Sequence, residues 1–442
     1  MDLAITNVTL VNVSEPTRAA VAPGMDILVR GSRIIAVQPT GNIDPSHAKT
    51  HIDGSGKIAF PGLINCHAHT PMVLFRGLAE DVPIDSWFND YIWQLEGNLI
   101  EDDVYWGMTL GLAEMITAGV TTVADHYFHM HQAARAVEQA GTRALLGWAV
   151  FSSAGEAMIE RTGDWAAEWN GAADGRIRTI FAPHAPYTCT DDYLRACAHK
   201  ARQLGIGIHI HAAETMGQTI ASVEKRGQTP IEVLEQTGIL DLPTIIAHGC
   251  GLTEKDIALL SRYTAGVAHA PKTYLKLAMD LTPILALHDA GIPVGLASDG
   301  ACSNNTLNLW ESLRLMAMLV KDRAQTPTVM TIPEALYVAT RGSARVIGME
   351  RDLGALEAGY LADIVLLDLS GLHHQPLYSV TTSLVYNTEI NDVETVIVNG
   401  QVIYRDRELL TIDKSAVLNE VRGRMSRLSR RTPSDRIQTY NP

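Results

Sequence analysis

Two histidines, His67 and His69, lie one residue apart at the end of a short apolar stretch that begins near Phe60. Side chains alternate along a β-strand, so both imidazoles would point to the same side. Two neutral imidazoles that converge in this way make half of a metal site, because zinc in proteins takes a few nitrogen, sulfur or carboxylate ligands. The pair therefore predicts a metal centre, provided that the rest of the chain supplies further ligands.

Histidines and acidic residues also follow other apolar stretches. They are Asp125-His126, His184, His209, His211, His248, His269 and Asp299. Histidines that only filled a core would not gather after nearly every apolar stretch, so the pattern favours a shared metal site. A catalytic zinc needs a few protein ligands and an open position for water. The predicted ligands are His67, His69, His211 and Asp299. His211 is preferred to His209 because it lies nearer the end of its strand, and His209 would then lie one layer deeper.

Short apolar strands alternate with helical stretches and would position these side chains. The predicted strands are Ala59–Asn65, Val120–Asp125, Ala144–Val150, Ile177–Ala182, Ile206–His211, Thr244–His248, Ala265–Ala268 and Val294–Ala297. Eight such repeats predict an α/β fold, a closed (β/α)8 barrel of the TIM type, in which active sites lie at the carboxyl ends of the strands. The rival, a doubly wound open sheet, would need a glycine-rich nucleotide fingerprint after an early strand, and the sequence has none.

The two ends of the chain have the pattern of β structure. Each end is too small to bury a core alone, so we expect residues 1–59 and 357–442 to form one small β-sandwich beside a barrel of residues 60–356. The dipeptide Asn399-Gly400 predicts a hairpin turn. The basic stretch Val417–Arg430 predicts an amphipathic helix that covers a protein surface, which is favoured over a role in membrane or nucleic-acid binding.

Composition narrows the class of protein. Hydrophobic residues make up 46% and charged residues 19%, as in globular proteins, and the net charge of −14 argues against a nucleic-acid partner. No apolar run is long enough to span a membrane, and the N-terminus lacks the pattern of a secretory signal. The five cysteines form no CxxC pair. We therefore expect a cytoplasmic protein without structural disulfides that acts on a small molecule.

Glu214 follows His211 by three residues, just past the predicted strand. A carboxylate there could reach over a metal without binding it, which suits a proton shuttle, although a charge at a helix start is the alternative interpretation. A binuclear site usually needs a bridging anion from the middle of the ring. The segment Ile177–Tyr187 contains no lysine for this purpose. We therefore expect one divalent metal per chain, zinc by default, with iron as the alternative.

Several motifs resemble the amidohydrolase superfamily over essentially the whole chain. They are Pro61-Gly-Leu-Ile-Asn-Cys-His-Ala-His-Thr70, His211-Ala-Ala-Glu-Thr215, Ala247-His248 and Ser298-Asp-Gly-Ala-Cys-Ser-Asn-Asn305. The branch that is most similar contains 5′-methylthioadenosine and S-adenosylhomocysteine deaminases, guanine deaminases and triazine hydrolases. The resemblance implies a homo-oligomeric aminohydrolase that acts on C–N bonds of cyclic amidines. In such enzymes the attack of a metal-bound hydroxide releases ammonia.

The resemblance also implies roles for single residues. Glu214 would protonate a ring nitrogen, while His248 and Asp299 would orient the attacking water and Asp299 would take its proton. Glu96 and His184 fall where adenosine-analogue deaminases bind the ribose and the base, and Ser303 lies in the segment after the metal aspartate. Trp87, Trp93 and Trp148 have flat rings that could stack on a base. The expected substrate is 5′-methylthioadenosine, with S-adenosylhomocysteine and adenosine as weaker options.

Two departures from the family keep alternatives open. Enzymes that accept S-adenosylhomocysteine can carry an arginine where this chain has Trp148, and Arg161 is the candidate substitute. The segment Ala270-Pro-Lys272-Thr-Tyr274 replaces the usual Asn-Pro-x-Ser-Asn. A lysine and an aromatic ring near the pocket would suit an s-triazine amino- or chlorohydrolase, or a deaminase of guanine or another purine. A non-catalytic barrel that only binds ligands is the third possibility.

Overall fold

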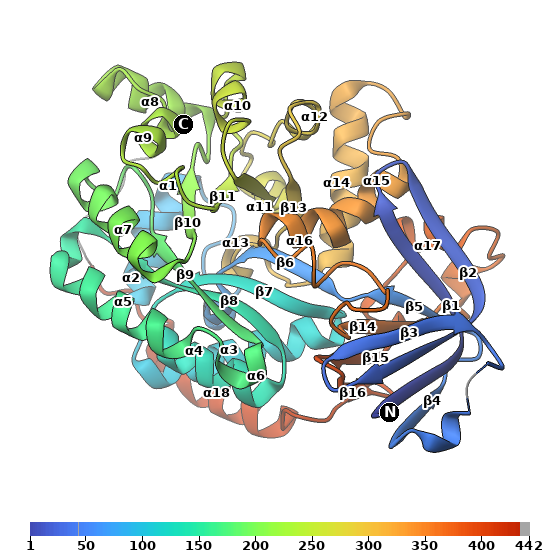
Figure 1. The fold of residues 1–442 in the computed structure, drawn as a ribbon. Helices are drawn as coiled ribbons and strands as arrows, with labels where there is room; N and C mark the ends of the chain where they lie inside the picture. The colour runs from blue at the N-terminus through green and yellow to red at the C-terminus, as the bar shows by residue number, and fades with distance from the viewer. Residues whose placement is uncertain (43, 434–442) are drawn as a thin grey trace.

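A parallel β-barrel surrounded by helices lies beside a mixed β-sheet in the computed structural model, which describes residues 1–42 and 44–433 (Figure 1). The barrel strands are β6 (Leu63–Ala68), β7 (Val120–Tyr127), β8 (Arg143–Val150), β9 (Ile177–Pro183), β10 (Ile208–Ala212), β11 (Thr244–His248), β12 (Ala265–His269) and β13 (Val294–Leu296). They pair in sequence order, and a parallel bridge from Ala68 to Asp299 brings the two ends of the row together. The predicted barrel is confirmed.

The barrel strands are almost fully buried because helices cover their outer faces, as parallel sheets require. The longer barrel helices are α3 (Glu101–Thr117), α4 (Met130–Ala140), α5 (Glu156–Trp169), α7 (Asp191–Leu204), α8 (Met216–Arg226), α9 (Pro230–Gln236), α10 (Glu254–Leu260) and α14 (Leu309–Ala324). Threonine side chains cap the first turns of α7 to α10 by accepting backbone N–H bonds, which fixes where these helices begin.

Shorter helices complete the barrel and its loops. They are α1 (Ile84–Ser86), the π-helix η3 (Trp87–Ile92), α2 (Trp93–Glu96), α6 (Ala172–Gly175), α11 (Pro271–Lys276), α12 (Ile284–Asp289), α13 (Ala301–Asn304), α15 (Ile332–Tyr337), the π-helix η5 (Val338–Gly342), α16 (Ser343–Val346) and the 3-10 turns η2 (Thr70–Phe75) and η4 (Ser152–Ala154). The turn η2 directly follows the histidine pair, and α1 to α2 lead on from it. These segments lie over the carboxyl ends of the strands (Figure 1).

The first predicted strand, Ala59–Asn65, is wrong as a single strand. Its residues belong to two strands in different sheets, β5 (Lys57–Pro61) and β6, and the chain crosses between the sheets at Gly62. The Gly62 N–H donates to the carbonyl oxygen of Asp363 at 3.0 Å. A Cβ atom at Gly62 would lie 2.2 Å from the Thr121 hydroxyl oxygen, so only glycine fits this crossing. The other seven predicted strands agree with the structure to within two residues at each end.

The two ends of the chain meet in the mixed sheet, as predicted. Besides β5 its strands are β1 (Leu3–Glu15), β2 (Arg18–Arg30), β3 (Arg33–Pro39), β4 (Thr50–Asp53), β14 (Ile364–Asp368), β15 (Val393–Val398), β16 (Gln401–Arg405) and β17 (Glu408–Leu409). Hydrogen bonds join them into one sheet in the order β17-β16-β15-β14-β5-β1-β2-β3, with β4 on β1. Ile5 and Ile27 share a buried cluster with Ile364 and Ile397, so the two halves enclose a common core. The domain limits at residues 59/60 and 356/357 stay a prediction.

The predicted hairpin turn and the predicted C-terminal helix are both present. Asn399 and Gly400 adopt positive φ angles of 54° and 78° between β15 and β16. The helix is α18 (Lys414–Leu428), and it lies against α3, where Arg424 and Arg427 form ion pairs with the buried Asp103. It therefore covers a barrel helix of its own chain. No helix in the described ranges is long and apolar enough to cross a membrane.

Candidate active site and metal centre

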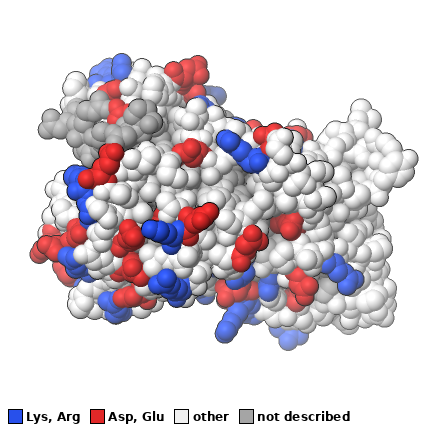
Figure 2. All heavy atoms as spheres, turned by 90° about the horizontal axis from the view of Figure 1, so that it is seen from above, with Lys and Arg blue, Asp and Glu red and all other residues white. Residues whose placement is uncertain are grey.

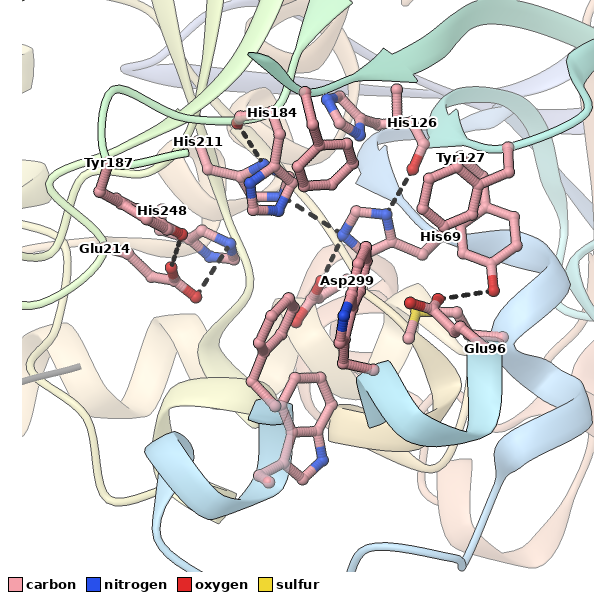
Figure 3. A pocket seen from close by; sticks show the side chains of 17 residues that line it. His69, Glu96, His126, Tyr127, His184, Tyr187, His211, Glu214, His248 and Asp299 are labelled. Atoms are coloured by element: carbon pink, nitrogen blue, oxygen red, sulfur yellow. Dashed lines mark hydrogen bonds and ion pairs between the residues drawn. The ribbon is translucent and has the colours of Figure 1, made fainter. Parts of the chain in front are cut away.

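The four predicted metal ligands converge at the carboxyl ends of the barrel strands. Figure 3 shows three of them, His69, His211 and Asp299. His67 and His69 lie at the end of β6, His211 lies near the end of β10, and Asp299 follows β13. The Nε2 atoms of His69 and His211 are 3.3 Å apart. Asp299 Oδ1 lies 3.4 Å from the Nε2 of His69 and 3.5 Å from the Nε2 of His67. Four donor atoms thus face one small space.

These spacings fit a divalent metal ion. Zinc–ligand bonds of ~2.0–2.2 Å in a tetrahedral arrangement place neighbouring ligand atoms ~3.3–3.5 Å apart. Among the described residues, His67 Nε2 has no hydrogen-bond partner although it is fully buried. A buried imidazole nitrogen without a partner is costly unless something binds its lone pair. The donor set, three imidazoles and one carboxylate, is the kind that catalytic zinc uses.

The other ring nitrogen of each histidine is held in place. His69 Nδ1 lies 2.5 Å from the carbonyl oxygen of His126, and His211 Nδ1 lies 2.9 Å from that of His184. Because a carbonyl oxygen only accepts, both Nδ1 atoms carry a proton and both Nε2 lone pairs point into the site. His67 Nδ1 lies 2.9 Å from Nε2 of His209, which is buried one layer deeper, where the sequence placed it.

Burial keeps four histidines at this end of the barrel neutral: His67, His184, His209 and His211. Desolvation, together with neighbouring imidazoles, holds the pKa of His67 and of His211 well below the ordinary value. The same two causes lower the pKa of His184 and of His209 to about 3. Neutral imidazoles are the form that binds metals. On the far side of Asp299, Ser303 Oγ donates to Oδ2 at 2.7 Å and leaves Oδ1 directed at the histidines.

Two of the residues that line the pocket adopt left-handed backbone conformations. The φ angles are 60° at Asp299 and 75° at His248, an arrangement that costs non-glycine residues on the order of 1–3 kcal/mol. Strain of this size persists only where the surrounding structure fixes the backbone. Asp299 lies in the segment after β13, and His248 is the last residue of β11. Both side chains line the pocket as a result.

Glu214 lies beside His248 and Tyr187 at one side of the pocket (Figure 3), and two donors hold its carboxylate. The Tyr187 hydroxyl and the Gln218 side-chain amide each donate to Oε2 at 3.1 Å. Oε1 lies 3.8 Å from Nε2 of His248. The carboxylate is therefore fixed beside the histidine cluster, and Glu214 is not in the groups of residues that could hold an ion. Its role as a proton shuttle stays a prediction.

The side chains of His69, His211, Glu214, His248 and Asp299 line one pocket. Its lining consists of His69, Met72, Trp87, Phe88, Trp93, Glu96, His126, Tyr127, Phe128, Ala149, Phe151, His184, Tyr187, His211, Glu214, His248 and Asp299. Glu96 accepts a hydrogen bond from the Tyr127 hydroxyl at 2.7 Å. Burial raises the pKa of Glu96 to about 7, against the opposing effects of this bond and of His69. No lysine or arginine is among the described residues that line the pocket.

Only some of the residues predicted to contact the substrate line the pocket. Glu96, His184, Trp87 and Trp93 line the pocket, whereas Trp148 and Ser303 are not among its lining residues. The substrate contacts stay a prediction. Side chains alternate along β8, so Ala149 faces the pocket and Trp148 points outward, where it packs edge-on against Trp165 of α5 and under the Arg161 guanidinium. Ser303 binds Asp299 instead of facing the pocket.

Lys272 and Tyr274 also lie outside the pocket lining. Lys272 Nζ pairs with Glu311 at 2.7 Å, and the buried Tyr274 hydroxyl accepts the backbone N–H of Ala270 at 2.9 Å. The sequence did not indicate several other residues of the pocket. His126 lines it, Tyr127 is the partner of Glu96, and Tyr187 is the partner of Glu214. The rings of Phe88, Phe128 and Phe151 form an aromatic wall. Tyr127, Phe128 and Phe151 sit at or just after strand ends, where aromatic residues also occur as core.

Comparison with known proteins agrees with this geometry. The model of the Amidohydrolase family matches residues 58–403, which include the barrel and every predicted ligand. The chain belongs to the amidohydrolase family.

Several similar proteins within this family have names that state an activity. A 5-methylthioadenosine/S-adenosylhomocysteine deaminase of Desulforudis audaxviator is 41% identical over 91% of this chain and 94% of its own length. One of Moorella thermoacetica is 39% identical over 96% and 99%. Among solved structures, an adenosine deaminase from Xanthomonas campestris with bound zinc has a TM-score of 0.90 and 32% identity over 97% and 98% of the two chains. An atrazine chlorohydrolase from Arthrobacter aurescens, complexed with zinc, has a TM-score of 0.85 and 25% identity over 96% and 100%.

Proposed function

We propose that this chain is a metal-dependent hydrolytic deaminase of adenine nucleosides, with 5′-methylthioadenosine as the preferred substrate and S-adenosylhomocysteine and adenosine as weaker ones. One observation carries the proposal: the half-buried Glu96 shares a pocket with His69, His211, His248 and Glu214. A carboxylate suits two ribose hydroxyls, and the cluster with Glu214 suits hydrolysis of an amidine carbon. Relatives about 40% identical over nearly the whole chain, which are named for this activity, support it.

His67, His69, His211 and Asp299 would hold one divalent ion per chain, with zinc favoured by the donor set. When bound, such an ion lowers the pKa of water and so supplies a nucleophile at neutral pH. Asp299 would accept the proton of that water through Oδ1, because Ser303 already occupies Oδ2. His248 lies across the cluster and would orient the water from the opposite side.

Glu214 is proposed as the acid that protonates the ring nitrogen next to the amino-bearing carbon. Protonation makes this carbon electrophilic. The proton that Asp299 took from the water would then pass to the amino group, which leaves as ammonia, and the added hydroxyl would return a proton to Glu214 as the carbonyl forms. Tyr187 and Gln218 fix the Glu214 carboxylate, so its distance from a bound ring would vary little. His184, whose ring stacks 4.5 Å from that of Phe151, would contact the base.

The remaining pocket surface favours an uncharged 5′ group. Trp93 lies between Phe88 and Phe151 and extends the aromatic wall, which suits a thioether such as methylthio. The amino-acid tail of S-adenosylhomocysteine carries a carboxylate, and the described lining offers it no cation. Arg161, the candidate substitute for an arginine, stacks on Trp148 outside the pocket. These features support methylthioadenosine over S-adenosylhomocysteine.

A substrate panel tests the proposal directly. Zinc-loaded enzyme is incubated with methylthioadenosine, adenosine and S-adenosylhomocysteine, and the loss of adenine absorbance and the release of ammonia are followed. We expect kcat/KM to be highest for methylthioadenosine and the Glu214→Gln variant to be nearly inactive. Absence of turnover with all three nucleosides by fully metal-loaded enzyme would reject the proposal.

The s-triazine alternative is tested by the same panel. Its motivation in the sequence was Lys272 and Tyr274, and neither lines the pocket. A structural likeness to an atrazine chlorohydrolase remains in its favour. A nucleoside-specific site should leave an aminated or chlorinated s-triazine and free guanine untouched, whereas faster turnover of these compounds than of nucleosides would favour the alternative.

A further inference from the structure

Residues 430–432, which follow α18 near the end of the described chain, lie against the helix α2. The Thr432 backbone N–H donates to the Gln94 carbonyl oxygen at 3.1 Å. The Thr432 hydroxyl donates to Asn98 Oδ1 at 3.1 Å, and the Asn98 side-chain amide donates to the Arg430 carbonyl oxygen. These residues, here called the tail clamp, therefore bind the segment in which α2 ends.

Arginine side chains hold the same helix. The Arg431 guanidinium lies over the Tyr91 ring, 4.6 Å from its centroid, and Nη1 donates to the Asp90 carbonyl oxygen at 3.3 Å. Arg427 of α18 donates to the Asn98 carbonyl oxygen at 2.5 Å. The last carbonyl groups of a helix have no partner within it, and nearby cations also offset the helix dipole. The tail clamp thus caps α2 from outside.

The same helical turns also line the active-site pocket. Trp93 and Glu96 line it, whereas Tyr91, Gln94 and Asn98 contact the tail clamp. Glu96 is the last residue of α2, and a glycine follows it. Helix ends fray where nothing holds them. The position of the Glu96 carboxylate therefore depends on what fixes this end of the helix.

The arginines of this region are engaged within the chain. Arg424 and Arg427 pair with the buried Asp103 of α3, and Arg431 lies over Tyr91. On the face shown in Figure 2, basic side chains are likewise interspersed with acidic ones. A surface that docks an acidic partner would instead gather cations without such contacts. The arrangement favours an internal role for the tail clamp.

We propose that the tail clamp positions Glu96 for the ribose hydroxyls of the substrate. The inference rests on the proposed function, in which the Glu96 carboxylate accepts these hydroxyl groups. Tyr127 holds the carboxylate from the pocket side through a bond of 2.7 Å, and the tail clamp holds the backbone of the helix from the outer side. A carboxylate that is already held loses little freedom when the substrate binds. Arg431 and Thr432 are therefore positioning residues that act through Glu96.

Deamination of adenosine and of dideoxyadenosine, which lacks the two hydroxyls of the ribose ring, tests the proposal in the full-length, metal-loaded enzyme. The double variant Arg431→Ala/Thr432→Pro removes the cation over Tyr91 and the N–H that donates to Gln94. We expect its KM for adenosine to rise ~10-fold with little change in kcat, because a contact to the bound hydroxyls is weakened. Its kinetics on dideoxyadenosine should stay within about 2-fold of native. Arg431→Lys keeps a cation over the ring and should retain a lower KM than Arg431→Ala.

Amide hydrogen exchange without substrate measures the tail clamp independently of turnover. In the double variant we expect faster exchange in residues 87–99 and native exchange in residues 177–183 of β9. Arg422→Ala is the matched control, because Arg422 is exposed on α18. It should change neither the exchange nor the KM. If the double variant unfolds at a lower temperature, Arg431→Ala alone should move both quantities in the same direction.

Equal losses on the two nucleosides would overturn the proposal, because a merely structural role would lower both alike. Native exchange in residues 87–99 of the double variant would overturn it as well, since the tail clamp would then not hold the helix. A native enzyme that turns over neither nucleoside would reject the proposed function and with it the ribose role. That failure is distinguishable, because the exchange measurement still shows whether the tail clamp holds α2.

Discussion

His209 does not line the pocket, but it can affect metal affinity through its contact with His67. Its Nε2 lies 2.9 Å from Nδ1 of His67. For His67 to bind an ion through Nε2, its Nδ1 must carry the proton and donate it to His209. His209→Leu removes this acceptor, and we expect a zinc affinity ~10–100-fold lower. His209→Gln keeps an acceptor and should restore part of the affinity.

Zinc competition against a chromophoric chelator measures this effect without relying on activity. His199→Leu is the control, because His199 lies on α7 and bonds only to Gln203 in the described structure. If His209→Leu holds zinc as tightly as the native protein, the positioning role is wrong.

Glu96 gives the pocket a predicted pH dependence. Burial raises its pKa to about 7, so the group is largely protonated below that pH and ionised above it. Only the carboxylate accepts two hydroxyl hydrogen bonds, so kcat/KM for methylthioadenosine should rise as pH increases from 6 to 8. The pKa values of the nearby Tyr127 and Cys302 lie well above their ordinary values, so neither titrates in this range.

Glu96→Gln separates this effect from other ionisations. Hydrogen bonds to a charged group contribute ~1.5–3 kcal/mol, so the variant should lose about 10- to 150-fold in kcat/KM at pH 8. It should also lose the rise between pH 6 and 8. A pH profile that keeps its native shape in Glu96→Gln would assign the ionisation to another group.

The sequence predicts some strands of this fold more accurately than others. The strands of the barrel were found because buried parallel strands are short apolar runs, and the candidate ligands were proposed because histidines and an aspartate follow those runs. The division at Gly62 was not found, because residues 58–64 form one continuous apolar run and the long-range pairing of β5 with β14 divides it. The orientation of Trp148 could not be predicted, because β8 carries no histidine or aspartate to indicate which of its faces points inward.

A buried ion pair links the barrel to the mixed sheet. Arg143 of β8 contacts both carboxylate oxygens of Asp363, at 2.9 and 3.0 Å, and also Asn399. Removing one member leaves a buried charge uncompensated, so Arg143→Met should lower the free energy of unfolding by about 3–5 kcal/mol. Urea unfolding measures this. Arg178→Met removes a longer, half-exposed pair with Asp352 and should cost less than about 1 kcal/mol. Equal losses in the two variants would contradict the argument.

The metal ligands connect distant parts of the whole molecule. His67 belongs to β6, His69 directly follows it and Asp299 follows β13, so they come from the first and the last strand of the barrel. In the described chain the seam between these strands contains the bridge from Ala68 to Asp299, the bond from the Asp299 N–H to the His67 carbonyl oxygen at 3.0 Å, and two hydrogen bonds between the Asn65 side chain and Ser298. By contrast, β8 pairs with β9 over seven residues. An ion held by this ligand set would therefore reinforce the seam that closes the barrel.

Removal of metal should accordingly loosen the barrel at one place. After chelation, we expect amide hydrogen exchange to accelerate in residues 63–69 and 294–304, while residues 143–150 and 177–183 keep their protection, because their ladder does not depend on the ion. Exchange followed by mass spectrometry on native and chelated protein measures this, and added zinc should reverse it. The His209→Leu variant should show the same local increase at zinc concentrations that still saturate the native protein. An increase spread evenly over all eight strands, or none at the seam, would mean that the ion serves the chemistry without closing the barrel.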